Sequence, residues 1–191
     1  LEFRRVLFRS IYDKNGNKIT ILDKMFEERT LFIIGSITDE TANYIVPSLL
    51  LFAKQSNDPI KLFINSPGGE INAGLAICNT MDLIKAPIHT YGYGMCASMA
   101  SFLLAKGEKG HRHILQDTVV MIHQPLGGAQ GQQTEIEIAY QRITSLRERL
   151  EKEYAEITGK TVKEIHKACD RDNYLVGEDA VKFGLVDTVL K

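Results

Sequence analysis

The sequence predicts an α/β protein in which short parallel strands alternate with helices. Four short runs of apolar and β-branched residues each end in turn-forming residues, as buried strands do. Between these runs, apolar residues return every three or four positions, which is the helical period. Strand, helix and strand at this spacing indicate right-handed parallel βαβ units. Strands are expected at 31–34, 60–64, 88–91 and 118–122, and helices at 39–55, 70–84 and 97–106.

The composition is typical of a soluble globular protein. A chain of 191 residues is long enough for one domain with a sizeable hydrophobic core. The formal net charge of −1 lacks the basic excess of a nucleic-acid binder. No apolar run approaches the roughly 20 residues that span a bilayer. We therefore expect an N-terminal segment over 1–20 and a single soluble domain over 21–191.

The cysteines and histidines form no metal-binding pattern. Cys78, Cys96 and Cys169 are odd in number and widely spaced, which gives neither a disulfide framework nor a zinc motif. Free thiols of this kind suit a reducing cytoplasm. His111 and His113 have no acidic or Cys-rich neighbours, so neither a metal nor another cofactor is expected.

The first ten residues, LEFRRVLFRS, do not fit the pattern of the rest of the chain. They combine three arginines with bulky apolar residues. An Arg-rich targeting arm is one interpretation, and a foreign tail, which we favour, is the other. Residues 1–10 are therefore left out of the fold prediction.

A long amphipathic helix is predicted over 134–158. At 1.5 Å per residue, about 25 helical residues measure nearly 40 Å, about the diameter of a domain of this size. The helix therefore either covers the domain along its length or projects from it toward another subunit. Its apolar residues return at helical spacing, with Glu, Arg and Lys between them: Ile136, Ala139, Ile143, Leu146, Leu150 and Ile157.

Three of the predicted strands are followed by residues that could carry chemistry, and α/β sheets bind ligands at such strand ends. Two of these features lie in turns that lead into helices. Gly68 and Gly69 can expose backbone N–H groups to an anion or a developing oxyanion, although by itself such a pair is more typical of a plain turn. Ser98 is flanked by the small residues Cys96 and Ala100, as in a nucleophile elbow. The alternative for Ser98 is a helix N-cap.

The third feature is His123, which directly follows the apolar strand 118–122. A serine nucleophile needs a base, because its neutral hydroxyl is weakly nucleophilic, and His123 is the best placed of the five histidines. Such a base needs a carboxylate that orients it. Asp172, Asp179 and Asp187 are all candidates, and the residues alone leave that choice open.

At these residues the sequence resembles the ClpP family, the proteolytic subunits of the ATP-dependent Clp protease, over roughly residues 24–190. The resemblance implies a ClpP/crotonase-like fold of repeated ββα units with a protruding handle helix. The order Ser, His, Asp differs from that of the α/β-hydrolases. The matching segments are INSPGGEINAG (64–74), GMCASMAS (94–101), MIHQPLGGAQGQQTEIEI (121–138) and DRDNYLVGEDAVKFGLVD (170–187).

The resemblance implies a role for each residue of the site. Ser98 is expected to be the nucleophile, His123 the general base and Asp172 the residue that orients the base. The backbone N–H groups of Gly69 and Met99 are expected to form the oxyanion hole. A peptide-binding strand is expected to pair with extended substrate, and its residues are Pro125, Leu126, Gly127 and Gly128.

The resemblance also implies partners. Copies of the chain are expected to form two stacked seven-membered rings, with Asp170 and Arg171 bridging the rings near the handle helices. The 191 residues contain no G-x-x-x-x-G-K-[ST] phosphate loop, so ATP hydrolysis is left to an AAA+ unfoldase of the ClpX, ClpA or ClpC type. Apolar pockets for that unfoldase are expected at Phe63, Leu83, Tyr91, Tyr93 and Leu190.

The predicted function is therefore a serine endopeptidase subunit of a compartmentalised protease that cleaves unfolded polypeptides. A crotonase-like acyl-CoA enzyme would share the fold and the oxyanion hole but needs no Ser-His-Asp set. A catalytically silent ring subunit is the second alternative. Such chains usually lack a triad residue, whereas this sequence has all three.

Overall fold

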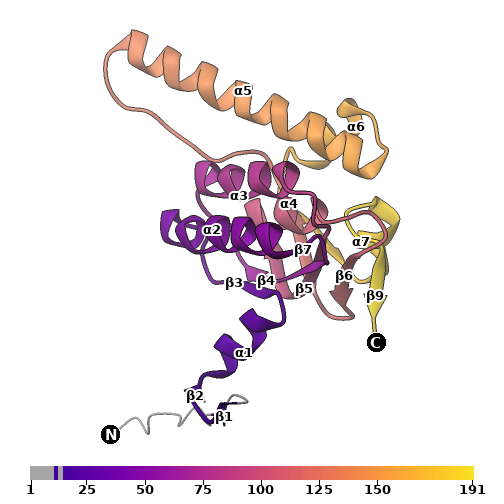
Figure 1. The fold of residues 1–191 in the computed structure, drawn as a ribbon. Coiled ribbons are helices and arrows are strands. Elements are labelled where there is room, and N and C mark those ends of the chain that lie inside the picture. Colours follow the sequence, from indigo (N-terminus) through magenta and orange to yellow (C-terminus); the bar gives the residue numbers. More distant parts are fainter. Residues whose placement is uncertain (1–10, 13–14) are drawn as a thin grey trace, which may run out of the picture.

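In the computed structural model, which describes residues 11–12 and 15–191, a seven-stranded sheet lies at the centre of the fold (Figure 1). The prediction for residues 1–10 lies outside the described residues. Neighbouring strands are parallel except for one antiparallel pair, β7 with β8. The strands are β3 (Thr30–Ile34), β4 (Ile60–Ser66), β5 (Ile88–Ala97), β6 (Arg112–Leu115), β7 (Val119–Ile122), β8 (Asn173–Val176) and β9 (Thr188–Leu190).

The sheet branches at β5, which is long enough to pair with two strands on the same side. Its first half pairs with β6 through Thr90–Gly92, and its second half pairs with β7 through Met95–Ala97. The predicted end of this strand at Tyr91 is therefore wrong. A Cβ on Gly92 would lie 2.9 Å from Cys96 Sγ, so this glycine permits close packing within a continuing strand instead of ending it in a turn.

The helices α2 (Asp39–Gln55), α3 (Ile71–Leu83) and α4 (Met99–Ala105) lie together on one side of the sheet (Figure 1). The predicted α/β class is confirmed, and so is the helix at 39–55, which continues through Pro47. Its first turn is closed by the Thr38 side chain, which accepts a hydrogen bond from the Thr41 N–H. The smaller elements are β1 (Ile11–Tyr12), β2 (Lys18–Ile19), α1 (Ile21–Glu27), α6 (Val162–Ala168) and α7 (Glu178–Phe183).

The long helix α5 (Gln133–Thr158) crosses above α3 and α4, and its first half extends past them (Figure 1). The C-terminal half packs on the domain, where Tyr154 and Ala155 are buried. Ile136, Ile138 and Tyr140 in the first half are exposed. Both sequence-based alternatives thus describe part of the helix, because one half covers the domain and the other projects. In the described part of the chain, every helix is too short or too polar to cross a lipid bilayer.

An ion pair between Arg112 and Asp187 connects the first residue of β6 to the residue before β9. Arg112 is 4% exposed, and its Nη2 donates to Asp187 Oδ1 over 2.6 Å while its Nε donates to Oδ2 over 2.9 Å. Burial raises the pKa of Asp187, but the hydrogen bonds and charge of Arg112 outweigh it, so the net pKa lies below the ordinary 3.8. The carboxylate therefore stabilises the fold in its ionised form.

We expect Asp187→Asn to lower the free energy of unfolding by about 3 kcal/mol at neutral pH, because it leaves a buried guanidinium without its countercharge. The lowered pKa means that this stabilisation is fully present above the unfolded pKa and is lost as the pH falls through the folded one. Denaturant unfolding of both proteins near pH 7 and near pH 3 measures this, and the difference should shrink at the lower pH. An equal difference at both pH values would contradict the prediction.

Candidate active site

Ser98 lies in a strained turn between β5 and α4. Its φ of 56° and ψ of −124° are uncommon for a residue with a side chain. The turn is held from two sides, because the Ser98 N–H donates to the Met121 carbonyl over 2.8 Å and the Ser98 carbonyl accepts from the Ser101 N–H. Ser98 occupies the N-cap position of α4, but its side chain makes no cap hydrogen bond, which favours the nucleophile elbow over a capping serine. The nucleophile role stays a prediction.

A line of hydrogen bonds joins Ser98 to His123 and Asp172. Ser98 Oγ lies 2.8 Å from His123 Nε2, and His123 Nδ1 lies 3.0 Å from Asp172 Oδ1. The Tyr174 hydroxyl donates to the other carboxylate oxygen of Asp172 over 3.3 Å. An imidazole that carries its proton on Nδ1 donates to the carboxylate and leaves Nε2 free to accept the serine proton. This arrangement can activate Ser98 as a nucleophile.

The other two candidate carboxylates lie elsewhere. Asp187 binds Arg112, and Asp179 pairs with Lys182 at the surface over 3.5 Å. Of the three aspartates that sequence reasoning left open, the structure therefore brings Asp172 to the histidine. Tyr174 was missed, although its place two residues after Asp172 on an exposed strand face puts its side chain on the same side.

The glycine turn between β4 and α3 packs directly against Ser98. A Cβ on Gly68 would lie 2.6 Å from the Ala97 carbonyl oxygen and 2.8 Å from Ser98 Cβ, so a side chain at this position would displace the serine. A Cβ on Gly69 would collide with the Ile37 carbonyl oxygen. Both glycines are therefore required by close contact, which a plain turn does not need.

The predicted oxyanion-hole donors occupy suitable backbone positions. The Ile37 N–H donates to the Gly68 carbonyl, and the Ile37 carbonyl accepts a hydrogen bond from the Glu70 N–H. The N–H of Gly69, which lies between these two residues, takes no part in this bridge. Met99 begins α4, and the first N–H groups of a helix have no partner within it. Both donors therefore suit an anion beside Ser98, and their role stays a prediction.

A small cavity of about 30 Å³ opens beside Ser98 and His123. Its wall is mostly apolar, and it also includes an ion pair in which Arg147 Nε donates to Glu151 over 2.7 Å. Sequence reasoning missed this pair, because nothing in the helical period distinguishes it from the surface charges of α5. The apolar lining consists of Ile71, Met99, Phe102, Pro125, Leu150 and Tyr154.

The predicted peptide-binding strand leaves this pocket and runs along the surface. Pro125 lines the pocket, whereas Leu126 is 81% exposed and Gly127 and Gly128 are exposed as well. The segment has no regular secondary structure, so its backbone is not paired in the sheet. Pairing with an extended substrate stays a prediction for these residues.

Four of the five predicted docking residues come together on the sheet face opposite α2 and α3. The Phe63 ring stacks on Tyr91 at 4.7 Å, and both line a mainly apolar pocket with Tyr93 and Leu190. Leu83 does not line it and is exposed at the end of α3. His113, which the resemblance places at the same docking surface, also lines this pocket. Sequence reasoning missed Gly92, because β5 was expected to end at Tyr91, and Ile114 and Leu115, because β6 was not predicted.

Asp170 and Arg171 lie at the surface between α6 and β8. Arg171 is 85% exposed at its side chain and donates to the Asp170 carbonyl over 3.0 Å, with the Asp170 carboxylate 3.9 Å away. The guanidinium is thus mostly available to another copy of the chain, and the inter-ring role stays a prediction. Across residues 11–12 and 15–191, no three His, Cys, Asp or Glu side chains gather as metal ligands would.

Comparison with known protein families gives a match that spans nearly the whole chain. A family model described as Clp protease matches residues 13–191. All the residues of the site described above lie inside the matched range.

Gly68→Ala should slow the reaction of Ser98 with a fluorophosphonate probe by about 10²-fold, because the added Cβ displaces the nucleophile turn. Gly35→Ala is the matched control. Its φ of 81° resembles the 92° of Gly68, but a Cβ there meets nothing within 4 Å. The control should lose only about 1 kcal/mol of stability and react at the normal rate. Equal reaction rates for the two variants would show that the close contact does not matter.

Proposed function

Because the chain belongs to the Clp protease family, we propose that it is a serine endopeptidase subunit that cleaves unfolded polypeptides through an acyl-enzyme. The observation that carries this proposal is the hydrogen-bonded line from Asp172 through His123 to Ser98. A crotonase-like acyl-CoA enzyme would not require this hydrogen-bonded set of Ser98, His123 and Asp172. A silent subunit would not be expected to retain a serine in strained, reactive geometry.

Acylation begins when Ser98 Oγ attacks the scissile carbonyl carbon. His123 Nε2 accepts the serine proton over the 2.8 Å contact, and Asp172 stabilises the imidazolium that forms. The N–H groups of Gly69 and Met99 donate to the tetrahedral oxyanion, an interaction whose loss typically costs on the order of 10²–10³ in rate. Collapse of this intermediate breaks the C–N bond, and His123 returns the proton to the departing amine.

Deacylation repeats the same steps with water as the nucleophile. His123 removes a proton from water, which attacks the ester carbonyl, and the oxyanion again faces Gly69 and Met99. Breaking the C–O bond returns the proton to Ser98 Oγ and releases the carboxylic acid product. The net reaction is hydrolysis of one peptide bond, and the described residues supply each proton transfer.

The apolar surroundings of the cavity beside Ser98 support a preference for apolar side chains before the scissile bond, and the cavity of about 30 Å³ has to widen to admit one. Its lining is mainly apolar, and the charges of Arg147 and Glu151 offset each other within the wall. A charged substrate side chain would lose its hydration there without gaining a free countercharge. Pro125, Leu126, Gly127 and Gly128 would then hold the substrate backbone as an added strand.

Assembly and partner docking complete the proposal. The projecting half of α5, with its exposed Ile136 and Ile138, supports contact between two rings of seven subunits. The pocket of Phe63, Tyr91, Tyr93 and Leu190 supports docking of an apolar segment from an AAA+ unfoldase. The exposed position of Leu83 leaves it outside this pocket within one chain.

Ser98→Ala should abolish cleavage of small fluorogenic peptides, with a loss of at least about 10³-fold, because triad members act as a unit. The assembled particle should stay intact, since the substitution removes one oxygen atom. Peptidase assays, probe labelling and sedimentation on the same sample measure both outcomes. Ser36→Ala, at an exposed serine outside the site, is the control. Retention of a tenth of the wild-type activity would refute the assignment of Ser98.

Arg171→Ala should shift the protein from double toward single rings and lower its activity, although no triad residue changes. An Arg–carboxylate pair between rings would hold Asp172 through the backbone, and it would be repeated around the ring. Sedimentation and peptidase assays on one preparation test this. Lys182→Ala, which removes an exposed cation away from the site, is the control. A variant that stays fully double-ringed and fully active would exclude this coupling.

A further inference from the structure

A buried polar cluster lies beside the triad, where α5 meets α6. Its centre is the Glu151 carboxylate, which is 5% exposed. Arg147 Nε donates to one of its oxygens over 2.7 Å, and His166 Nδ1 lies 3.0 Å from the other. A buried carboxylate is costly unless its oxygens are bonded, so these contacts hold Arg147 in one orientation.

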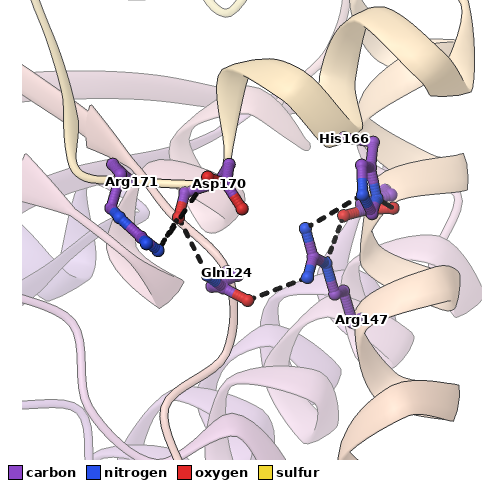
Figure 2. A network of polar contacts seen from close by, with 6 residues as sticks. Gln124, Arg147, His166, Asp170 and Arg171 are labelled. Carbon is purple, nitrogen blue, oxygen red and sulfur yellow. Dashed lines mark hydrogen bonds and ion pairs between the residues drawn. The ribbon is translucent and has the colours of Figure 1, made fainter.

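Arg147 also reaches the segment that carries His123. Its Nη1 donates to Gln124 Oε1 over 2.8 Å, and Gln124 Nε2 donates to the Asp170 carbonyl over 2.8 Å (Figure 2). A guanidinium can only donate, so the amide oxygen of Gln124 faces Arg147 and its NH₂ group faces Asp170. One side chain thus connects the residue after His123 to the residue two before Asp172.

This connection lies where the sheet no longer supports the triad. The last pair in the β7–β8 ladder is Ile122 with Asn173, so His123 and Asp172 lie one residue beyond it. Asp172 is half exposed at its side chain, and within residues 11–12 and 15–191 its carboxylate is held, apart from His123, by the 3.3 Å hydrogen bond from Tyr174. Beyond the last backbone pair of the ladder, the hydrogen bond from the Gln124 side chain to the Asp170 carbonyl connects the two chain segments.

We infer that Arg147 is a positioning residue for the reaction, which acts through Gln124 to keep His123 and Asp172 at hydrogen-bonding distance. This inference rests on the proposed function. Glu151 and His166 fix the guanidinium, the guanidinium orients the Gln124 amide, and the amide clamps the two chain segments that carry the base and its carboxylate. A shift approaching 1 Å between such groups costs on the order of 10² in rate.

The main test compares Gln124→Met, Arg147→Met and the double variant in peptide hydrolysis. Each single variant should lower kcat by about tenfold or more, with a smaller change in KM. Because Arg147 acts through Gln124, the double variant should be no slower than the slower single one. Independent losses that multiply in the double variant would overturn the inference. Arg149→Met, on the same helix but bonded to Glu153 and Asn79, should keep wild-type kcat.

Gln124→Glu separates clamping from simple packing of α5 on α6. It keeps an acceptor for Arg147 but replaces the NH₂ group that donates to Asp170 with an oxygen. We expect it to be as slow as Gln124→Met, with an unchanged melting temperature because the Glu151 cluster stays intact. Wild-type kcat in Gln124→Glu would overturn the inference, and it would leave the proposed function standing.

A wild-type protein without Ser98-dependent hydrolysis would instead overturn the proposed function, and this inference with it. Ser98→Ala is therefore assayed in the same series. The fluorophosphonate labelling rate of each variant provides a second readout, because it reports the activation of Ser98 without a substrate side chain in the pocket. It should fall in parallel with kcat in the Gln124 and Arg147 variants.

Discussion

β7 hydrogen-bonds to β5 along one edge and to β8 along the other, and these two ladders align three distant segments of the chain. Ser98 follows the last residue of β5, His123 follows β7, and Asp172 precedes β8. Because side chains alternate between the two faces of a strand, a slip of one residue in either ladder would turn His123 away from its partners. The candidate site therefore depends on the register of β7.

The strain at Ser98 depends on the same strand. A positive φ at a residue with a side chain is unfavourable, and it persists when surrounding contacts leave no alternative. The Met121 carbonyl in β7 accepts a hydrogen bond from the Ser98 N–H, and Gly68 packs closely against Ser98, so the turn cannot relax to another conformation. The glycine turn and the turn at Ser98 thus constrain each other.

The long helix α5 connects this site with the surface expected to meet other copies. Its first half is exposed, and its second half carries Arg147 and Glu151 into the wall of the pocket beside Ser98. Gln124 hydrogen-bonds to Arg147 and to the Asp170 carbonyl, so it connects the helix to the chain segments that carry His123 and Asp172. A displacement of α5 during assembly would therefore shift Arg147 and Gln124, and with them the segments that carry His123 and Asp172, without a change in the sheet.

Local sequence determined the elements whose signals lie within a few residues of each other. The 39–55 helix, the ends of β3 and β7 and the small residues around Ser98 are of this kind, and so is the place of His123 directly after an apolar strand. Local patterns did not distinguish Asp172 from Asp179 and Asp187; the family resemblance did, and the tertiary structure brings Asp172 to His123. Tertiary structure alone extended β5 past its glycines and joined Arg147 to Gln124. These outcomes depend on contacts between residues far apart in the chain, and periodicity and turn chemistry carry no information about such contacts.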